Sequence, residues 1–243
     1  MKTALTSLAK NRSWIGWILL VVNFILGLVT LYWGSFVDEA DNLVVGDLLR
    51  QGVSLYGGVF SHHFPFPYYW MALVIVIFGK SIFWARFSVL MFQIAAFAIA
   101  MSLSGKHLLV GMTALMWGIT RPFYLGHMVL YFSFAGVSLF VLLLTILPIL
   151  EGTVLPNWKH WVVIALFSII AFLSTPLAAY AVAVALAFLL VKKPSWGITP
   201  GLIIAGGLAI FFGALVITDT FQIFWKDAIL FNIQVYAKYT GAD

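Results

Sequence analysis

The chain has 243 residues, of which 63% are hydrophobic and 9% are charged. A soluble domain carries roughly 25% charged residues, so this composition excludes an ordinary soluble enzyme. With a mean hydropathy of +1.08, it indicates a polytopic membrane protein. The net charge of +5 does not indicate a nucleic-acid partner, because the basic residues stand singly or in pairs at the ends of apolar runs. The absence of cysteine excludes disulfides and thiolate metal sites.

The first apolar run, residues 14–33, is long enough to span a bilayer. Lys2, Lys10 and Arg12 precede it, and basic residues beside a first span favour the cytoplasmic side. We therefore expect a cytoplasmic N-terminus. No A-x-A-like cleavage site follows, so the run is expected to be retained as a signal anchor.

A polar stretch, residues 34–69, follows this span on the outer side. It contains four of the eight acidic residues and two of the five histidines: Asp38, Glu39, Asp41, Asp47, His62 and His63. Ionisable residues gathered in one segment of an apolar chain mark a functional site. Apolar residues at helical spacing after Ser35, and a stop at Gly52, predict a helix on the membrane surface.

The remaining apolar runs predict about seven crossings in total. The expected spans are residues 14–33, 67–78, 87–103, 128–150, the two halves of 160–191, and 198–217. The run 67–78 is short for a crossing, and we expect Lys80 and Arg86 to flank an inner turn after it. Residues 108–119 are also short. We favour a half-membrane or surface helix with both ends outside over a full crossing. The favoured arrangement brings Arg121 and His127 near the acidic stretch.

After the last span, residues 221–233 carry aromatic and aliphatic side chains at roughly helical spacing, as in an amphipathic helix on the outer surface. The expected fold is therefore all-α. It is a polytopic transmembrane helical bundle of about seven spans, with amphipathic surface helices in the first and last outer loops. Residues 1–243 form one module in this interpretation.

Several segments in this order resemble a known family. They are DEAD at 38–41, LLRQGVSLY at 48–56, HHFPFPYY at 62–69, FGKS at 78–81 with Arg86, and DAILFNIQVYAKYT at 227–240. The arrangement resembles the N-terminal transmembrane module of GT-C fold glycosyltransferases. Within that family it is most similar to the subgroup of protein mannosyltransferases and lipid A aminoarabinose transferases.

The resemblance implies an inverting transfer of a sugar from a polyprenyl-phosphate donor to a glycan, lipid or protein acceptor, in a bacterial or archaeal plasma membrane. Asp38 matches the family's general base, and Glu39 is its neighbour. An acceptor hydroxyl must lose its proton as the anomeric carbon is attacked, and a carboxylate can take it. A lipid-phosphate leaving group needs a basic partner, for which the outer side offers His62, His63, Arg121 and Lys226. His127 and Tyr236 complete the expected substrate-binding set.

Two departures from the family stand in the sequence. The segment RPFYLGHMVLYF at 121–132 offers no second carboxylate, so no metal ligand is assigned and a divalent cofactor is doubtful. Family members also continue with further spans beyond the point where this sequence ends. A fragment of a longer enzyme is therefore one interpretation. An inactive membrane scaffold is another.

Each site residue also has a structural interpretation. Asp38 can serve only as a helix-start acid, and Arg121 can be an interfacial anchor. Lys226 and Tyr236 can simply hold the last helix at the headgroups. A lipid or solute transporter is the rival from another class, but its mark is ionisable residues in the middle of spans, and the expected spans are nearly free of them.

Overall fold

The structure is a computed structural model that describes residues 13–32, 37–120, 130–236 and 238. At residues 37, 38, 130–132 and 236 it describes the backbone alone. Within the described part the secondary structure is helical, with one isolated bridge between Leu55 and Val59 and no β-strand. The predicted all-α fold is confirmed.

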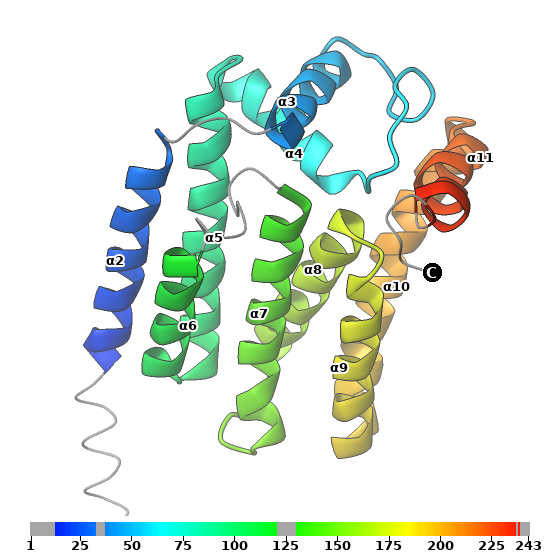
Figure 1. Ribbon diagram of the computed structural model, residues 1–243. Helices are drawn as coiled ribbons and strands as arrows, with labels where there is room; N and C mark the ends of the chain where they lie inside the picture. Colours follow the sequence, from blue (N-terminus) through cyan, green and yellow to red (C-terminus); the bar gives the residue numbers. More distant parts are fainter. Residues whose placement is uncertain (1–12, 33–36, 121–129, 237, 239–243) are drawn as a thin grey trace, which may run out of the picture.

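The core of the molecule is a bundle of helices that lie side by side (Figure 1). Its members are α2 (Ser13–Thr30), α5 (Ile82–Ser104), α6 (His107–Thr120), α7 (Leu130–Leu150), α8 (Trp158–Ser174), α9 (Ala178–Lys192) and α10 (Pro194–Ile217). Four of them, α2, α5, α7 and α10, contain stretches of at least 18 residues that are long and apolar enough to cross a bilayer. The chain is a membrane protein.

The two ends of the bundle differ in charge. One end carries Lys106, Lys159, Lys192 and Lys193 at the turns between helices, with Glu151 paired to Lys106. We call it the basic end. The other end carries α3 (Val37–Arg50), α4 (Phe66–Phe78) and the segment after α10 (Figure 1). With them come the acids Glu39, Asp41 and Asp47, and the cations paired to them, Arg50, Lys80 and Arg86. We call it the acidic end.

The prediction that residues 67–78 cross the membrane is wrong. Helix α4 packs against α3 across the acidic end, and both of its ends touch α3. Near its start the Tyr68 hydroxyl donates to Asp41 Oδ2 at 3.0 Å, and just past its end Lys80 Nζ donates to Asp47 Oδ2 at 2.8 Å. The physical reason is these two contacts, which bind both ends of α4 to α3. The 13 residues of α4 rise about 20 Å, which is in addition short for about 30 Å of hydrocarbon.

The favoured prediction for residues 108–119 is also wrong. Helix α6 begins at the basic end, beside the pair of Lys106 and Glu151, and runs alongside α2 in the same direction, toward the acidic end (Figure 1). Its start is therefore not on the side of α3, as the prediction required. Glycines explain the close approach of the two helices: a Cβ atom added to Gly111 would lie 2.6 Å from the Gly16 carbonyl oxygen. Gly118 likewise faces Asn23. Helix α6 is thus a member of the bundle, whereas residues 67–78, which were predicted to be a member, are not.

The last two predicted features agree with the structure. The long run 160–191 divides into α8 and α9 at Thr175, which is extended, and Pro176. The segment after α10 is helical, with α11 (Phe221–Phe224) and the π-helical turns η2 (Trp225–Leu230) and η3 (Asn232–Tyr236) at the acidic end. Phe224 is buried, whereas Trp225 and Ile233, which the prediction placed on the same apolar face, are exposed.

The α2–α6 contact gives a test of the packing. Gly111→Ala should destabilise the protein by about 1–3 kcal/mol, because the new methyl group meets the Gly16 backbone and the two helices must separate. Gly206→Ala in α10 is the matched control, since a Cβ atom there meets nothing within 4 Å. Thermal unfolding of both variants in detergent measures the difference, and equal stabilities would contradict the packing described here.

Candidate functional site

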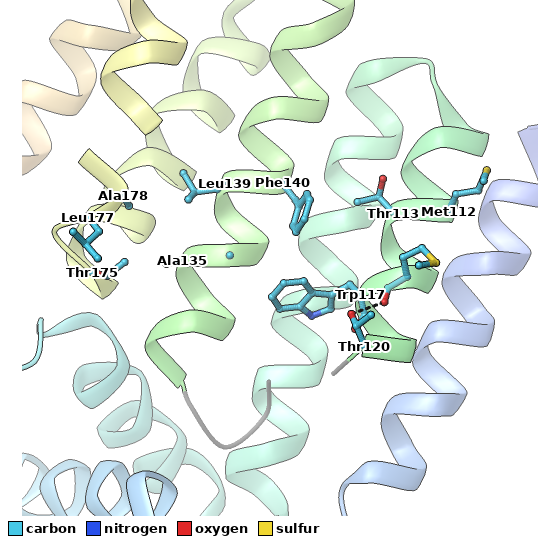
Figure 2. A pocket seen from close by; sticks show the side chains of 12 residues that line it. Met112, Thr113, Trp117, Thr120, Ala135, Leu139, Phe140, Thr175, Leu177 and Ala178 are labelled. Atoms are coloured by element: carbon cyan, nitrogen blue, oxygen red, sulfur yellow. Dashed lines mark hydrogen bonds between the residues drawn. The ribbon is translucent and has the colours of Figure 1, made fainter. Parts of the chain in front are cut away.

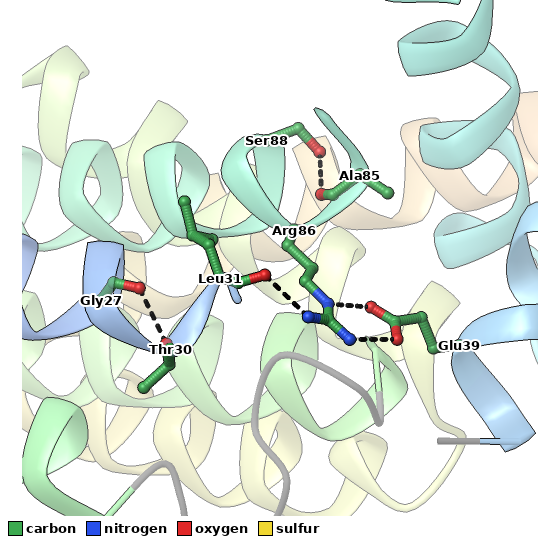
Figure 3. A network of polar contacts seen from close by, with 7 residues as sticks. All are labelled: Gly27, Thr30, Leu31, Glu39, Ala85, Arg86 and Ser88. Atoms are coloured by element: carbon green, nitrogen blue, oxygen red, sulfur yellow. Dashed lines mark hydrogen bonds and ion pairs between the residues drawn. The ribbon is translucent and has the colours of Figure 1, made fainter. Parts of the chain in front are cut away.

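Helix α3 is anchored to the bundle by a buried ion pair between Glu39 and Arg86 (Figure 3). Arg86 Nε donates to Glu39 Oε1 at 2.5 Å and Nη2 donates to Oε2 at 2.8 Å. Arg86 Nη1 donates to the carbonyl oxygen of Leu31, just past the end of α2, at 2.7 Å. Both charged side chains are about 97% buried. One guanidinium therefore joins the end of α2, the first turn of α3 and the first turns of α5.

This pair changes the roles that the sequence suggested. Glu39 was expected beside the general base, and the structure makes it a positioning residue for α3. Arg86 was expected at an inner turn, and it lies at the acidic end with Glu39. One signal in the sequence could have found the pair: Arg86 is a lone charge in the apolar run 82–104, and such a charge needs a partner.

Asp38 is the second residue of α3 and precedes the anchored Glu39. Its side chain lies outside the described part of the structure, so the role of general base remains a prediction. Arg121 and His127 lie outside the described residues altogether. Tyr236 ends η3, and its side chain is likewise not described. Lys226 lies in η2 and is exposed at the acidic end.

A hydrogen-bond network joins α3 to the loop between α3 and α4. Ser61 Oγ donates to the hydroxyl of the buried Tyr68, which donates to Asp41 Oδ2. The backbone N–H of His63 donates to Ser61 Oγ at 3.1 Å, and the Tyr56 hydroxyl donates to the His63 carbonyl oxygen at 2.8 Å. The histidine segment is therefore held in a fixed conformation beside α3.

The two predicted histidines do lie together, with ring centroids 3.8 Å apart. Burial, and then the charge of His62, lower the pKa of His63 to about 3. At neutral pH the His63 ring is uncharged and is a poor partner for a phosphate. The backbone of His62 links this loop to the C-terminal segment, since Asn232 Nδ2 donates to the His62 carbonyl oxygen at 2.6 Å.

A second charged cluster, which the sequence did not predict, lies at the far end of α3. The Asp47 carboxylate accepts hydrogen bonds from Arg50 at 3.0 Å, Gln51 at 3.1 Å and Lys80 at 2.8 Å. Lys80 and, after it, Arg50 hold the pKa of Asp47 below its ordinary value. The sequence interpretation missed the cluster because it placed Lys80 on the opposite side of the membrane.

A cavity of about 780 Å³ opens between α6, α7 and the start of α9 (Figure 2). Its walls are mostly apolar and include Met116, Trp117, Phe140 and Leu177. It lies in the half of the bundle nearest α3 and α4, because its lining includes the last residue of α6 and the turn between α8 and α9. Its size and lining suit a hydrocarbon chain.

Among the described residues, no three His, Asp or Glu side chains converge in a way that could hold a metal ion. No chemical step is assigned to a metal ion. The sequence matches no protein-family model, and neither the curated proteins nor the solved structures give a match.

The Glu39–Arg86 pair is testable through stability. Glu39→Ala leaves the Arg86 guanidinium buried without its carboxylate, which should cost about 3–5 kcal/mol of unfolding free energy. The double variant Glu39→Leu/Arg86→Met should recover most of this loss, because no buried charge remains.

The matched control for this pair is Glu151→Ala. It breaks the more exposed ion pair with Lys106 and should cost about 1 kcal/mol or less. Chemical unfolding in detergent micelles measures all three variants. A Glu39→Ala loss no greater than that of Glu151→Ala would show that the pair does not anchor α3.

The lowered pKa of His63 predicts a pH dependence. The folded protein resists protonating His63, so between pH 6.5 and about 3 the unfolded chain binds more protons and stability falls as the pH falls. At pH 5 the protonation of His63 in the unfolded chain should lower the free energy of unfolding by about 2 kcal/mol. His63→Gln should therefore lose less stability between pH 7 and pH 5 than the wild type.

Thermal unfolding at the two pH values measures this effect, with His107→Gln at the basic end as the control. An identical pH dependence in wild type and His63→Gln would contradict the assigned environment of His63.

Proposed function

We propose that this protein is a membrane glycosyltransferase of the GT-C type. It transfers a hexose or pentose, with inversion, from a polyprenyl-phosphate donor to an acceptor at the acidic end of the bundle. The observation that carries the proposal is the placement of α3. Its first turn holds Asp38 and Glu39 at the rim of an apolar bundle, and the Glu39–Arg86 pair fixes it there.

A fixed carboxylate at the membrane rim suits this chemistry. In the proposed reaction Asp38 accepts the proton of the acceptor hydroxyl while its oxygen attacks the anomeric carbon, and the bond to the lipid phosphate breaks. A base acts well only when its support is rigid. Glu39, one residue further on, supplies this rigidity through Arg86.

The apolar cavity supports a lipid-linked donor. Its volume of about 780 Å³ lies in the same half of the bundle as α3, so a polyprenyl chain held there would carry its phosphate toward the acidic end. For the phosphate partner, Arg121 and Lys226 remain candidates. His63 is the weaker one, because its lowered pKa of about 3 leaves the ring uncharged.

The distribution of basic residues suggests the orientation, because Arg50, Lys80 and Arg86 at the acidic end form ion pairs with Asp47 and Glu39. Lys106, Lys159, Lys192 and Lys193 belong to the basic end, and Lys2, Lys10 and Arg12 precede α2 in the chain. Basic residues favour the cytoplasmic side, so we assign the basic end and the N-terminus to the cytoplasm. The acidic end then faces outward in a bacterial or archaeal plasma membrane.

The rival interpretations are a lipid or solute transporter and an inactive scaffold. A transporter is expected to carry ionisable residues in the middle of its spans. In the described parts of the bundle helices, Arg86, His107, Lys159, His160 and Lys192 all lie within the first or last two turns. This distribution favours chemistry at the membrane surface over a path through the bundle.

The test is transfer from polyprenyl-phosphate-linked hexoses and pentoses to glycan, lipid and protein acceptors by the purified protein in liposomes. Wild-type protein should release polyprenyl phosphate, and Asp38→Asn should reduce the rate by about 10²–10⁴-fold, because the proton acceptor is lost. The lipid product is measured by mass spectrometry.

Asp219→Asn is the matched control. It removes an acidic charge near the end of α10, and asparagine tolerates the left-handed backbone of that residue (φ 54°). It should keep the wild-type rate. A folded wild-type protein that consumes none of these donors would contradict the proposed function. Full activity in Asp38→Asn would contradict only the assigned base.

A further inference from the structure

A cleft at the acidic end is separate from the proposed catalytic residues. It lies between the last turns of α3 and α4 and has a volume of about 450 Å³. Its lining combines three charged residues, Asp47, Arg50 and Lys80, with the apolar side chains Ile75 and Val76. A cleft with charge on one side and hydrocarbon on the other suits an amphiphile.

The charged side of the cleft is suited to an anion. Asp47 sits between two cations, so the three side chains carry a net charge of +1 (two positive charges and one negative charge). The Asp47 side chain is 12% exposed, whereas those of Arg50 and Lys80 are 42% and 60% exposed. Arginine and lysine carry more N–H donors than these contacts with Asp47 use. The outward-facing groups of the cluster are therefore cationic donors.

The apolar side of the cleft continues along α4. Tyr69, Leu73 and Val76 follow one another at helical spacing and are 52%, 52% and 65% exposed. Helix α4 lies across the end of the bundle and does not cross it, so this exposed apolar stripe lies at the level of the membrane interface. The stripe leads toward Lys80, just past the end of the helix.

We propose that this cleft binds an anionic membrane phospholipid. The headgroup phosphate contacts Arg50 and Lys80, and an acyl chain lies along the apolar stripe of α4. Charge complementarity and the continuous apolar surface identify the occupant as a lipid of the surrounding bilayer. The site would hold α4 at the interface, and it does not depend on the proposed glycosyltransferase activity.

The first test titrates the purified full chain in detergent with phosphatidylglycerol and counts the bound lipids by native mass spectrometry. Arg50→Gln and Lys80→Gln should each weaken binding about five-fold, and the double variant by roughly 30-fold. Asp47→Asn should strengthen binding about five-fold, because it removes the competing negative charge. Opposite effects from neighbouring residues distinguish a binding site from a general loss of structure.

Lys192→Gln is the control, since Lys192 is an exposed lysine at the basic end and lies outside the cleft. It should bind phosphatidylglycerol like the wild type. Lys80 is largely exposed, so Lys80→Gln should remain folded, and thermal unfolding checks this. Unchanged lipid binding in a folded Lys80→Gln/Arg50→Gln variant would overturn the proposal.

Two further probes identify the source of the phosphate. Phosphatidylcholine should bind more weakly than phosphatidylglycerol, because its headgroup has no net charge. Inorganic phosphate should not displace phosphatidylglycerol at equal concentration, because it makes no contact with the apolar stripe. Displacement by inorganic phosphate that requires Arg50 and Lys80 would show a soluble-anion site and overturn the assignment to a lipid.

Discussion

The buried ion pair between Glu39 and Arg86 is the constraint on which the acidic end depends. Two charges inside an apolar bundle are costly unless they meet, and here they meet in a bidentate contact. Because Arg86 also binds the Leu31 carbonyl oxygen, the contact fixes the end of α2, the start of α3 and the start of α5 to one another. The surface helix α3 thus has a defined place, which a proposed catalytic carboxylate requires.

The second consequence concerns α4. Once Arg86 must reach Glu39, α5 has to begin at the acidic end, and the short helix before it cannot cross the membrane. The contacts of Tyr68 with Asp41 and of Lys80 with Asp47 then hold α4 against α3 at both ends. The same arrangement exposes one apolar face of α4 and brings two cations beside it. A single electrostatic requirement therefore shapes the proposed catalytic rim and the proposed lipid site.

Composition and apolar runs were sufficient to predict the all-α membrane bundle, the surface helix from 37 to 50 and the division of 160–191. They were insufficient for α4 and α6, which are both short and apolar but have different positions. What separates them is tertiary: Gly16, Gly111 and Gly118 let α6 approach α2 along its length, whereas Tyr68 and Lys80 bind α4 to α3. The rule that basic residues favour the cytoplasmic side placed Arg86 and Lys80 at the wrong end. Both residues form ion pairs within the protein, with Glu39 and Asp47, and do not mark a cytoplasmic loop.

Single-cysteine labelling tests the central claim most directly, because the natural chain contains no cysteine. Asp41→Cys in α3, Lys80→Cys just past α4, and Leu155→Cys at the basic end each introduce one reactive thiol at an exposed residue. In sealed vesicles of one orientation, a membrane-impermeant maleimide should label Asp41→Cys and Lys80→Cys from the same side and Leu155→Cys from the other. Labelling of Lys80→Cys on the side of Leu155→Cys would mean that α4 crosses the membrane, that Arg86 cannot reach Glu39, and that this account is wrong.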